Sequence, residues 1–511
     1  MNDAQRTYIT TTIPYVNARP HLGFALELVQ ADVLARHARQ RGDQVRALTG
    51  TDDNSLKNVL AAQAEGIPVQ DLVDRNAAAF AALREPLALS FDDFIRTSSD
   101  VRHRVGVERL WRRCAESGDL YRKHYEGLYC VGCEQFYTPE DLIDGRCPEH
   151  GTAPQVVAEE NWFFRLSRYT EQLRELITSG RLRIEPASRR NEILALIEGG
   201  LHDSSVSRSH TRAHGWGIPV PGDPDQVIYV WWDALGNYVT SLGYGTDHPD
   251  LATWWNESTR RVHLAGKGVI RFHAVYWPAM LLSAGLPLPT DILVHDYLTI
   301  DGQKISKSSG PTADPASLAE QVGTDAVRWW LLREVPRTGD ADFTLERLVE
   351  RANSDLAGGF GNLVHRTVTM IHRYRDGIVP EPATYTHALT PATDRLERAC
   401  DAAPNAIEAA LEDFDFRRAI AAVWTIVEEA NRAIEATRPW QLAKAERDGD
   451  TRASADLDAT LALLHRACVT LAAILAPFLP AAAELISVQC TPTPVAGRLP
   501  ASVALFPRIE H

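Results

Sequence analysis

The stretch TTIPYVNARPHLGFALELVQADVLARHARQRG, residues 11–42, decides the fold. It begins at the end of an apolar, β-branched run that Pro14 closes, and it continues with apolar residues at helical spacing up to Gly42. The next stretch, VRALTGTDDNS (residues 45–55), is a second short strand that runs into polar residues. A strand, a helix and a strand in this order predict a βαβ unit and therefore a parallel sheet.

The loops that follow these two strands carry the first candidate site residues. Ligands of parallel sheets bind at the carboxyl ends of the strands, and residues 14–21 and 49–55 both lie at such ends. His21 and Gly23 stand in the turn PHLGF at the start of the predicted helix. Because the N-terminus of a helix attracts anions and a glycine allows close backbone approach, this turn is typical of phosphate binding.

The composition is that of a large globular protein with reduced thiols. The chain has 511 residues and a net charge of −14, so any contact with nucleic acid depends on a local patch or on stacking. No run approaches the roughly 18 uncharged apolar residues of a membrane span, and the polar N-terminus is unlike a signal peptide. We therefore expect a cytoplasmic protein without a membrane partner, whose seven cysteines are reduced.

The rest of the chain divides by pattern. The βα pattern stops near residue 116 and resumes after the Pro- and Gly-rich segment GIPVPGDPDQ, so the residues between are an insertion. Beyond residue 350, long amphipathic segments predict an antiparallel helix bundle. We expect a parallel-sheet domain in two halves (1–115 and 226–325), the insertion (116–225), a linker (326–350), a helical domain (351–490) and a C-terminal strap (491–511).

The insertion contains a candidate metal site. Cys130 and Cys133 are separated by two residues, as are Cys147 and His150, and 13 residues lie between the two pairs. This spacing is a strong signal for structural zinc, and a disulfide is the weaker alternative in a reducing compartment. Since four protein ligands leave no open coordination position, the Zn2+ would fold a small knuckle and take no part in catalysis.

A second candidate for phosphate chemistry lies in DGQKISKSSG, residues 301–310. Lys304 and Lys307 flank Ser306 in a Gly- and Ser-rich loop that follows a predicted strand. Two ammonium groups on such a loop suit a pyrophosphate whose charge develops in a transition state. The spacing alone is a weak signal, and a solvated loop is the alternative. The pair of motifs in this order, at the first strand–helix turn and after the last strand, is more specific.

These motifs resemble those of class I aminoacyl-tRNA synthetases. PHLGF resembles the HIGH motif and KISKS matches the KMSKS motif. Over roughly residues 7–480 the chain is similar to the methionyl-tRNA synthetase family, in the segments TTIPYVNARPHLGF, YVWWDALGNYVTSL, RFHAVYWPAML, VHDYLTIDGQKISKS, GNLVHR and RPWQLAK. The resemblance implies an α/β fold: a Rossmann-like catalytic domain, an inserted connective domain with a zinc knuckle, and an all-α anticodon-binding domain.

The resemblance also implies the reaction and its residues. The carboxylate of methionine attacks the α-phosphate of ATP, which is bound with Mg2+, and the methionyl group then passes to the terminal ribose of tRNA. The implied catalytic residues are His21, Gly23, Lys304 and Lys307, and ATP would also contact Phe24, Gly266, Lys267, His295 and Asp296. The implied methionine pocket is an apolar, aromatic one with Asp52 at the ammonium, and its walls are Ile13, Tyr15, Trp231, Ala234, Leu235, Tyr238 and His273.

For tRNA, the resemblance implies an anticodon site in the helical domain. Asn362 and Arg366, at positions i and i+4, share one helix face, and Trp440 follows Pro439 at a bend. Stacking and hydrogen bonds to unpaired bases would let an acidic protein bind RNA. We expect a monomer that binds methionine tRNA, ATP and L-methionine, since the chain ends without the tRNA-binding module through which the family's dimers form.

Four departures from the family pattern cluster around the implied ATP site. Phe24 stands where HIGH has its second His, and TDDNS replaces the usual TDEHG, which makes Asn54 and Ser55 atypical. Gly268 stands where GKDI has a carboxylate, and Asp296 stands where a glycine is usual. The methionine walls, the zinc ligands and the anticodon residues all match, so the nucleotide side alone is remodelled. One carboxylate is lost and another gained, which suggests an exchange between the last two positions.

Three functions fit these departures. The chain is a working methionyl-tRNA synthetase, or a duplicate of that enzyme whose altered ATP site evades an inhibitor, or a non-catalytic protein that binds tRNA or methionine. The third predicts tRNA binding without turnover. The intact KISKS loop, residues 304–308, argues against it, because a binding module has no use for two lysines at this spacing.

Overall fold

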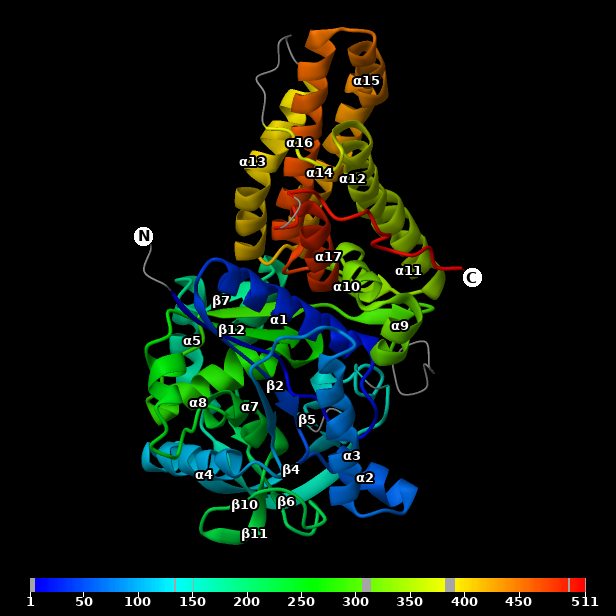
Figure 1. The fold of residues 1–511 in the computed structure, drawn as a ribbon. Coiled ribbons are helices and arrows are strands. Elements are labelled where there is room, and N and C mark those ends of the chain that lie inside the picture. The colour runs from blue at the N-terminus through cyan, green and yellow to red at the C-terminus, as the bar shows by residue number, and fades with distance from the viewer. Residues whose placement is uncertain are drawn as a thin grey trace. The chain divides into compact units, whose positions relative to one another are not determined.

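The computed structural model describes residues 5–132, 135–149, 151–305, 314–381, 391–494 and 497–510. The chain forms two compact units. The first comprises Met1–Glu85, Leu89–Tyr297 and Ile305–Gly310, and the second Pro86–Ala88, Leu298–Lys304 and Pro311–His511. Figure 1 shows the helices and strands of both with their labels.

A six-stranded parallel sheet is the centre of the first unit. Its order is β3-β2-β1-β12-β13-β7. Every adjacent pair is parallel, which confirms the predicted sheet. The strands are β1 (Arg6–Thr10), β2 (Gln44–Thr51), β3 (Asp93–Arg96), β7 (Arg183–Glu185), β12 (Arg260–Gly266) and β13 (Asp291–His295). The chain leaves β1 toward β2 on one side, while β12 lies on the other, so a topological switch point stands at the carboxyl end of β1.

Helices flank this sheet (Figure 1). Those of the first unit are α1 (Leu22–Gln40), α2 (Leu56–Glu65), α3 (Val69–Ala81), α4 (Val101–Glu116), α5 (Thr170–Thr178), α6 (Ala187–Glu198), α7 (Val230–Thr240) and α8 (Trp277–Ala284). The inner faces of α4 to α8 share one core with the sheet, in which Tyr8, Trp255 and Trp277 are fully buried. Gly50 lets β2 and β3 pair, because a Cβ there would lie 2.1 Å from the carbonyl oxygen of Ile95.

The predicted insertion, residues 116–225, contributes two antiparallel sheets, but it also contains α5, α6 and β7, and β7 is an edge strand of the parallel sheet. One sheet has the order β5-β4-β6-β8 and a smaller one the order β10-β11-β9. The strands are β4 (Leu120–Cys130), β5 (Gln135–Tyr137), β6 (Gln155–Phe164), β8 (Ser204–Ser205), β9 (Ser207–Ser209), β10 (Pro219–Val220) and β11 (Asp223–Ile228). The longest pairing joins β4 to β6, from Leu120 opposite Phe164 to Tyr129 opposite Gln155. The sequence predicted turns in this region, and it did not predict the long antiparallel pairing of β4 with β6.

The second unit is mostly helical, as the amphipathic segments predict. Its helices are α9 (Pro315–Val322), α10 (Thr324–Arg333), α11 (Leu345–Arg351), α12 (Asn362–Arg375), α13 (Pro391–Glu412), α14 (Phe416–Thr437), α15 (Pro439–Arg447), α16 (Thr451–Leu475) and α17 (Pro480–Cys490). Three short strands, β14 (Leu298–Ile300), β15 (Gln303–Lys304) and β16 (Ala341–Asp342), precede the bundle or lie at its start. Residues 326–350, predicted as a linker, contain most of α10 and all but the last residue of α11.

Helix α16 is the central helix of the bundle. By length and composition alone it could cross a membrane, but 56% of its most apolar window is buried inside the protein. It packs against α12, α13, α14, α15 and α17. It also carries Asp458 and Arg466, which pair with Arg375 and Asp401. These contacts are those of a core helix.

The C-terminal tail runs back over the second unit. The side-chain amide of Asn353 donates to the carbonyl of Ile509 and accepts from its N–H, both at 2.9 Å. The side chain of Gln489 holds the backbone of Val503 in the same way, with both bonds at 3.1 Å. The tail is thus fastened through its backbone at two points.

Candidate active site

The turn after β1 brings a histidine to the switch point. His21 caps α1, and its Nδ1 accepts a hydrogen bond from the N–H of Gly23 at 3.1 Å. Because Nδ1 is the acceptor, the proton of the neutral ring is on Nε2, which makes that nitrogen the donor. A Cβ at position 23 would lie 3.0 Å from Cε1 and Nδ1 of His21, so glycine gives the ring room to fold over the backbone. The turn presents a donor at a helix N-terminus, where anions bind.

Phe24 does not extend this turn toward a ligand. Only 8% of the residue is exposed, and its ring packs edge-on against Phe80 with 5.2 Å between centroids. We predicted an ATP contact for Phe24, but its side chain lies in the core between α1 and α3. The physical reason is the helical period, which places position 24 on the same buried face as Leu28.

A buried acid joins the carboxyl ends of β1 and β13. Glu27 accepts hydrogen bonds from the N–H and hydroxyl of Thr12 at 2.5 and 2.6 Å, and its other oxygen lies 2.8 Å from Nε2 of His295. Burial lowers the pKa of His295, but the bond and charge of Glu27 outweigh it and raise that pKa above its ordinary value. His295 also stands opposite Gly266 in the register of β12 and β13. The pair holds three strand ends together.

Both carboxylate departures are accommodated by neighbours. Asp296 is 5% exposed and forms an ion pair with Arg189 of α6. At Gly268, a Cβ would lie 2.0 Å from the hydroxyl of Tyr297, so that hydroxyl occupies the space of any side chain there. Tyr297 in turn lies beneath the ammonium of Lys267, 4.6 Å from its ring centroid. The suggested exchange of one carboxylate for the other stays a prediction, and in this structure the carboxylate of Asp296 is paired with Arg189.

We call these groups, from His21 to Phe24, from Gly266 to Gly268 and from His295 to Asp296, the nucleotide half of the site. The side chain of Lys304 and all of Lys307 lie outside the described residues. The backbone of Lys304 forms β15, which pairs with β14. The lysine loop therefore stays a prediction.

The predicted methionine residues form an aromatic wall. The ring of Trp231 stacks on Phe272 with 3.9 Å between centroids and 3° between planes, and Tyr15 meets it edge-on at 6.2 Å. Trp231 and Ile13 are half-buried, whereas Ala234 and Leu235 are buried. We call this wall, with Tyr238 and His273, the methionine half of the site. Phe272 was not predicted, although it directly precedes His273 in the sequence.

A hydrogen-bonded pair closes this wall. The hydroxyl of Tyr238 lies 2.7 Å from Nε2 of His273, and Nδ1 of His273 lies 2.9 Å from the carbonyl of Val269. The carbonyl can only accept, so Nδ1 carries the proton and Nε2 accepts from the hydroxyl. Burial lowers the pKa of His273 and raises the pKa of Tyr238 well above its ordinary value, which keeps both groups neutral.

A second buried histidine supports the wall from beneath. The ring of His263 stacks on Tyr238 with 4.2 Å between centroids. Its Nε2 accepts from the indole N–H of Trp277 at 3.1 Å, and Nδ1 lies 2.6 Å from the hydroxyl of Thr10. Since Trp277 can only donate, Nδ1 carries the proton. Burial lowers the pKa of His263 well below its ordinary value.

Asp52 lies at the carboxyl end of β2, beside Tyr15. Its backbone N–H donates to Pro14 at 2.9 Å, and the two residues Tyr15 and Asp52 form an isolated parallel bridge. The residue is 1% exposed, and its Oδ1 accepts from the N–H of Asn54 at 3.2 Å. The neighbouring Asp53 is turned away toward Arg96, 2.8 Å distant. Asp52 is thus the carboxylate on the side of the methionine half.

Two of the four predicted zinc ligands are described, and they lie together. Cys130 and Cys147 are both 1% exposed and belong to one small cluster with Tyr137. The thiol of Cys147 lies 3.6 Å from the hydroxyl of Tyr137. Cys133 and His150 lie outside the described residues. Within the described ranges, no group of three or more His, Cys, Asp or Glu side chains is arranged to hold a metal ion.

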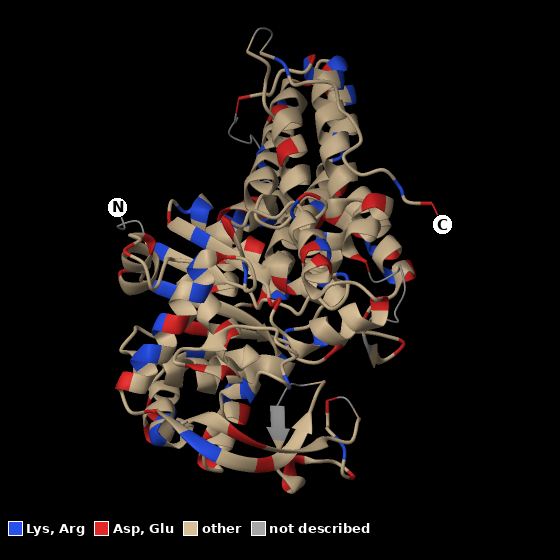
Figure 2. Ribbon diagram, turned by 90° about the horizontal axis from the view of Figure 1, so that it is seen from below, with Lys and Arg blue, Asp and Glu red and all other residues tan. Residues whose placement is uncertain are grey.

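The predicted anticodon residues all lie in the second unit. Asn362 is exposed and Arg366 half-buried on α12, and Trp440 at the start of α15 is 45% exposed. Helices α12 and α15 are joined by the ion pair of Arg375 with Glu446 at 3.0 Å. Figure 2 shows Lys, Arg, Asp and Glu interspersed along the ribbon. An exposed indole on a charged, mixed surface suits stacking more than broad electrostatic attraction.

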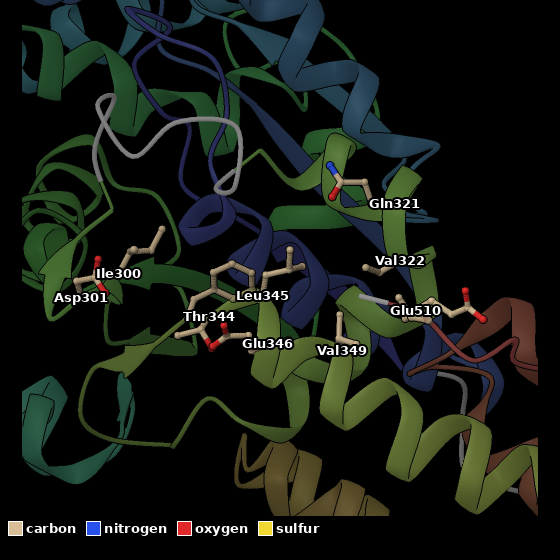
Figure 3. A pocket seen from close by; sticks show the side chains of 11 residues that line it. Ile300, Asp301, Gln321, Val322, Thr344, Leu345, Glu346, Val349 and Glu510 are labelled. Carbon is tan, nitrogen blue, oxygen red and sulfur yellow. The ribbon is translucent and has the colours of Figure 1, made fainter.

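A cavity of about 520 Å3 lies elsewhere, in the second unit (Figure 3). Ile300, Leu345 and Val349 form apolar parts of its lining, and Glu346 and Glu510 contribute carboxylates. Acidic side chains repel phosphate, so this cavity does not suit a nucleotide. None of the predicted site residues lines it.

Comparisons with known proteins agree with this geometry. The model of the family described as tRNA synthetases class I (M) matches residues 7–154 and 137–368. A methionine–tRNA ligase of Brucella suis biovar 1 is 39% identical over 99% of this chain and 98% of its own length. One of Caldanaerobacter subterraneus subsp. tengcongensis is 42% identical over 86% of this chain and 67% of its own length. Among solved structures, Mycobacterium tuberculosis methionyl-tRNA synthetase bound by methionyl-adenylate matches with a TM-score of 0.91 and 36% identity, covering 98% of this chain and 100% of that chain.

Proposed function

The chain belongs to the methionyl-tRNA synthetases of class I, and we propose that it activates L-methionine with ATP and transfers the methionyl group to methionine tRNA. The proposal is supported by the place of the His21 turn after β1 and by Tyr15, which forms a bridge with Asp52 at the end of β2 and meets the ring of Trp231 edge-on. A charged small molecule with an apolar side chain can bind there beside a nucleotide.

The methionine half would select the amino acid. Stacked rings offer their faces and edges to a thioether, and sulfur–ring contacts are favourable. The neutral Tyr238–His273 pair offers no net charge, so a charged side chain of similar length would be desolvated without a partner. Asp52 would hold the ammonium group. Together these groups would leave the carboxylate of methionine directed toward the nucleotide.

The nucleotide half would act in the adenylation step. An oxygen of the methionine carboxylate attacks the α-phosphorus of ATP, a new P–O bond forms, and the bond to the leaving pyrophosphate breaks. No protein nucleophile is needed, so orientation and charge stabilisation carry the catalysis. The Nε2–H of His21 would donate to a phosphate oxygen, and Gly266 and Lys267 would line the nucleotide beside His295.

Lys304 and Lys307 would neutralise the pyrophosphate from the KISKS loop, and Asp296 would act only indirectly, through Arg189. Mg2+ bound with ATP supplies further charge neutralisation on the phosphates.

We further propose that Cys130, Cys133, Cys147 and His150 hold a structural zinc ion. The donor set suits zinc, and the two described thiols are buried in one cluster beside Tyr137. Metal analysis of the purified protein tests this proposal. We expect one zinc per chain, and less than half of that in the Cys147→Ser variant; a metal content that is unchanged in this variant would contradict the assignment.

For tRNA, we propose that Asn362, Arg366 and Trp440 read the anticodon. The support is the indole of Trp440, which is 45% exposed, and the shared face of Asn362 and Arg366 on α12. We also propose that the protein is a monomer and that it works in the cytoplasm, where translation takes place.

Aminoacylation of methionine tRNA by the purified chain, with labelled methionine, tests the proposed function. We expect charging that depends on ATP and is not supported by leucine or isoleucine. Tight tRNA binding without charging would favour the non-catalytic alternative. An inhibitor-evading duplicate would perform the same reaction, and a dose–response curve with an inhibitor of ordinary methionyl-tRNA synthetases would distinguish it.

A further inference from the structure

One asparagine at the end of β2 contacts both sides of the methionine half. The N–H of Asn54 donates to Oδ1 of Asp52 at 3.2 Å, and its side-chain amide donates to Oδ2 of Asp233 at 3.1 Å. The same amide nitrogen lies 3.3 Å from the carbonyl of Thr97 at the end of β3. Asp233 belongs to α7, two residues after Trp231 and one before Ala234. Asn54 therefore connects the predicted ammonium ligand with the helix that carries the aromatic wall.

The Asp233 carboxylate depends on this contact. The residue is fully buried, and burial raises the pKa of its carboxyl group. Its Oδ1 lies 3.9 Å from Nε2 of His103, too far for a hydrogen bond, and neither atom has a hydrogen-bond partner within the described part of the chain. On its other side, His103 lies 2.9 Å from the hydroxyl of Thr240, also on α7. The side-chain amide of Asn54, at 3.1 Å, is thus a closer donor to the buried carboxylate of Asp233 than the ring of His103.

We propose that Asn54 is a positioning residue that sets the distance between the Asp52 carboxylate and the methionine wall on α7. It acts through Asp52 and Asp233, and the inference rests on the proposed function, in which Asp52 binds the methionine ammonium. Without the side-chain amide of Asn54, the buried carboxylate of Asp233 loses this hydrogen-bond donor. The loop that carries Asp52 then loses its hydrogen bond to α7.

This role also explains the departure at position 54. An imidazole N–H can donate to Asp233 as an amide N–H can, so the His of the TDEHG pattern and Asn54 are two solutions to one geometric requirement. The departure lies between Asp52 and α7 and has no described contact with the nucleotide half.

The test separates methionine from ATP. In methionine-dependent ATP–pyrophosphate exchange, Asn54→Ala is expected to raise the KM for methionine about tenfold, while the KM for ATP is unchanged. Asn54→His, which restores an N–H donor, is expected to recover most of the affinity for methionine. The matched control is Asn161→Ala, which removes another buried amide, in β6, and is expected to leave both KM values unchanged.

A ligand without the ammonium group sharpens this test. 4-(Methylsulfanyl)butanoic acid has the side chain and carboxylate of methionine, and its inhibition constant is expected to be the same for the wild type and Asn54→Ala. Equal weakening of this acid and of methionine would overturn the proposal, since it would indicate general loosening of the wall. An equal rise of both KM values would overturn it as well.

Two further outcomes are distinguishable. If Asn54→Ala does not fold, the isosteric Asn54→Asp replaces the donor by an oxygen that faces Asp233, and a wild-type KM for methionine in that variant would overturn the proposal. If the wild type shows no methionine-dependent exchange, the proposed function itself fails. If the wild type exchanges and Asn54→Ala has the same KM for methionine, the positioning role alone fails.

Discussion

The methionine half and the nucleotide half of the site are built in different ways. In the methionine half, rings contact rings: Trp231 stacks on Phe272, and Tyr238 stacks on His263. In the nucleotide half, polar groups are held in separate pairs, such as Glu27 with His295 and Asp296 with Arg189. In the nucleotide half, Phe24, Gly268 and Asp296 depart from the family pattern. No residue of the aromatic wall departs from it.

This difference indicates which kind of site tolerates change. A ring in a stack contacts several others, so its replacement leaves a cavity or an unpartnered polar group. A polar pair can be rebuilt locally, as the hydroxyl of Tyr297 against Gly268 illustrates.

The largest effect is expected at that donor. His21→Ala removes the Nε2–H at the N-terminus of α1 and is expected to lower kcat of ATP–pyrophosphate exchange by about 10² to 10³, because one preorganised donor to a developing charge contributes that much. The KM for methionine is expected to stay the same. His21→Asn, which keeps an N–H donor, is the control. An equal loss of kcat in both variants would contradict the role of His21 as a donor and would indicate that its ring acts by packing.

The second effect lies in the wall. Trp231→Ala removes the ring that stacks on Phe272 and is expected to raise the KM for methionine about 100-fold, with the KM for ATP unchanged. Exchange kinetics measure both values. Trp440→Ala is the matched control in the second unit, and it is expected to impair only the charging of tRNA. A rise of the KM for ATP in Trp231→Ala would mean that the two halves are not separable.

A smaller effect is expected when one atom of the wall is removed. Tyr238→Phe deletes the hydroxyl that donates to Nε2 of His273 and leaves a buried acceptor without its donor. Such a loss costs about 1–3 kcal/mol, so the KM for methionine is expected to rise about tenfold. Wild-type kinetics in this variant would show that the Tyr238–His273 pair is not part of methionine binding.

The smallest effect concerns stability and depends on pH. Because Glu27 raises the pKa of His295, the pair stabilises the fold fully below the unfolded-state pKa of about 6.5, and this stabilisation is lost as pH rises through the raised folded-state pKa. Glu27→Gln is therefore expected to lower the melting temperature more at about pH 6 than at about pH 9.

The control for this measurement is Glu171→Gln on α5, whose partner Arg174 does not titrate in this range. If Glu27→Gln lowers the melting temperature equally at both pH values, the charge of the Glu27–His295 pair does not contribute to stability, and the pair acts only as an uncharged hydrogen bond.

The sequence was sufficient for the parallel sheet and for the aromatic wall. The period of the segment after Pro14 and the polar ends of two strands predict where the site lies. The resemblance of YVWWDALGNYVTSL (residues 229–242) to the family indicated Trp231 and Tyr238, and their role in methionine binding stays a prediction. These features are local, so a short window of sequence contains them.

The partners of the nucleotide half could not be predicted. Glu27 and His295 are 268 positions apart, and Arg189 and Asp296 are 107 positions apart, so only the folded chain brings each pair together. The burial of Phe24 could have been predicted from the helical period, because Phe24 shares a helix face with Leu28. The prediction of an ATP contact was based only on its place in the motif. The pairing of β4 with β6 is likewise long-range and was missed.

Methionine-dependent ATP–pyrophosphate exchange, measured side by side on the wild type and on Phe24→His, tests the central claim that the nucleotide half is changed but complete. Because the ring of Phe24 is buried against Phe80, we predict ordinary exchange in the wild type, with a kcat of about 1 s⁻¹ or more, and no gain in Phe24→His. An inactive wild type that Phe24→His restores would contradict the account, since it would show that position 24 serves the nucleotide and that adenylation had been lost.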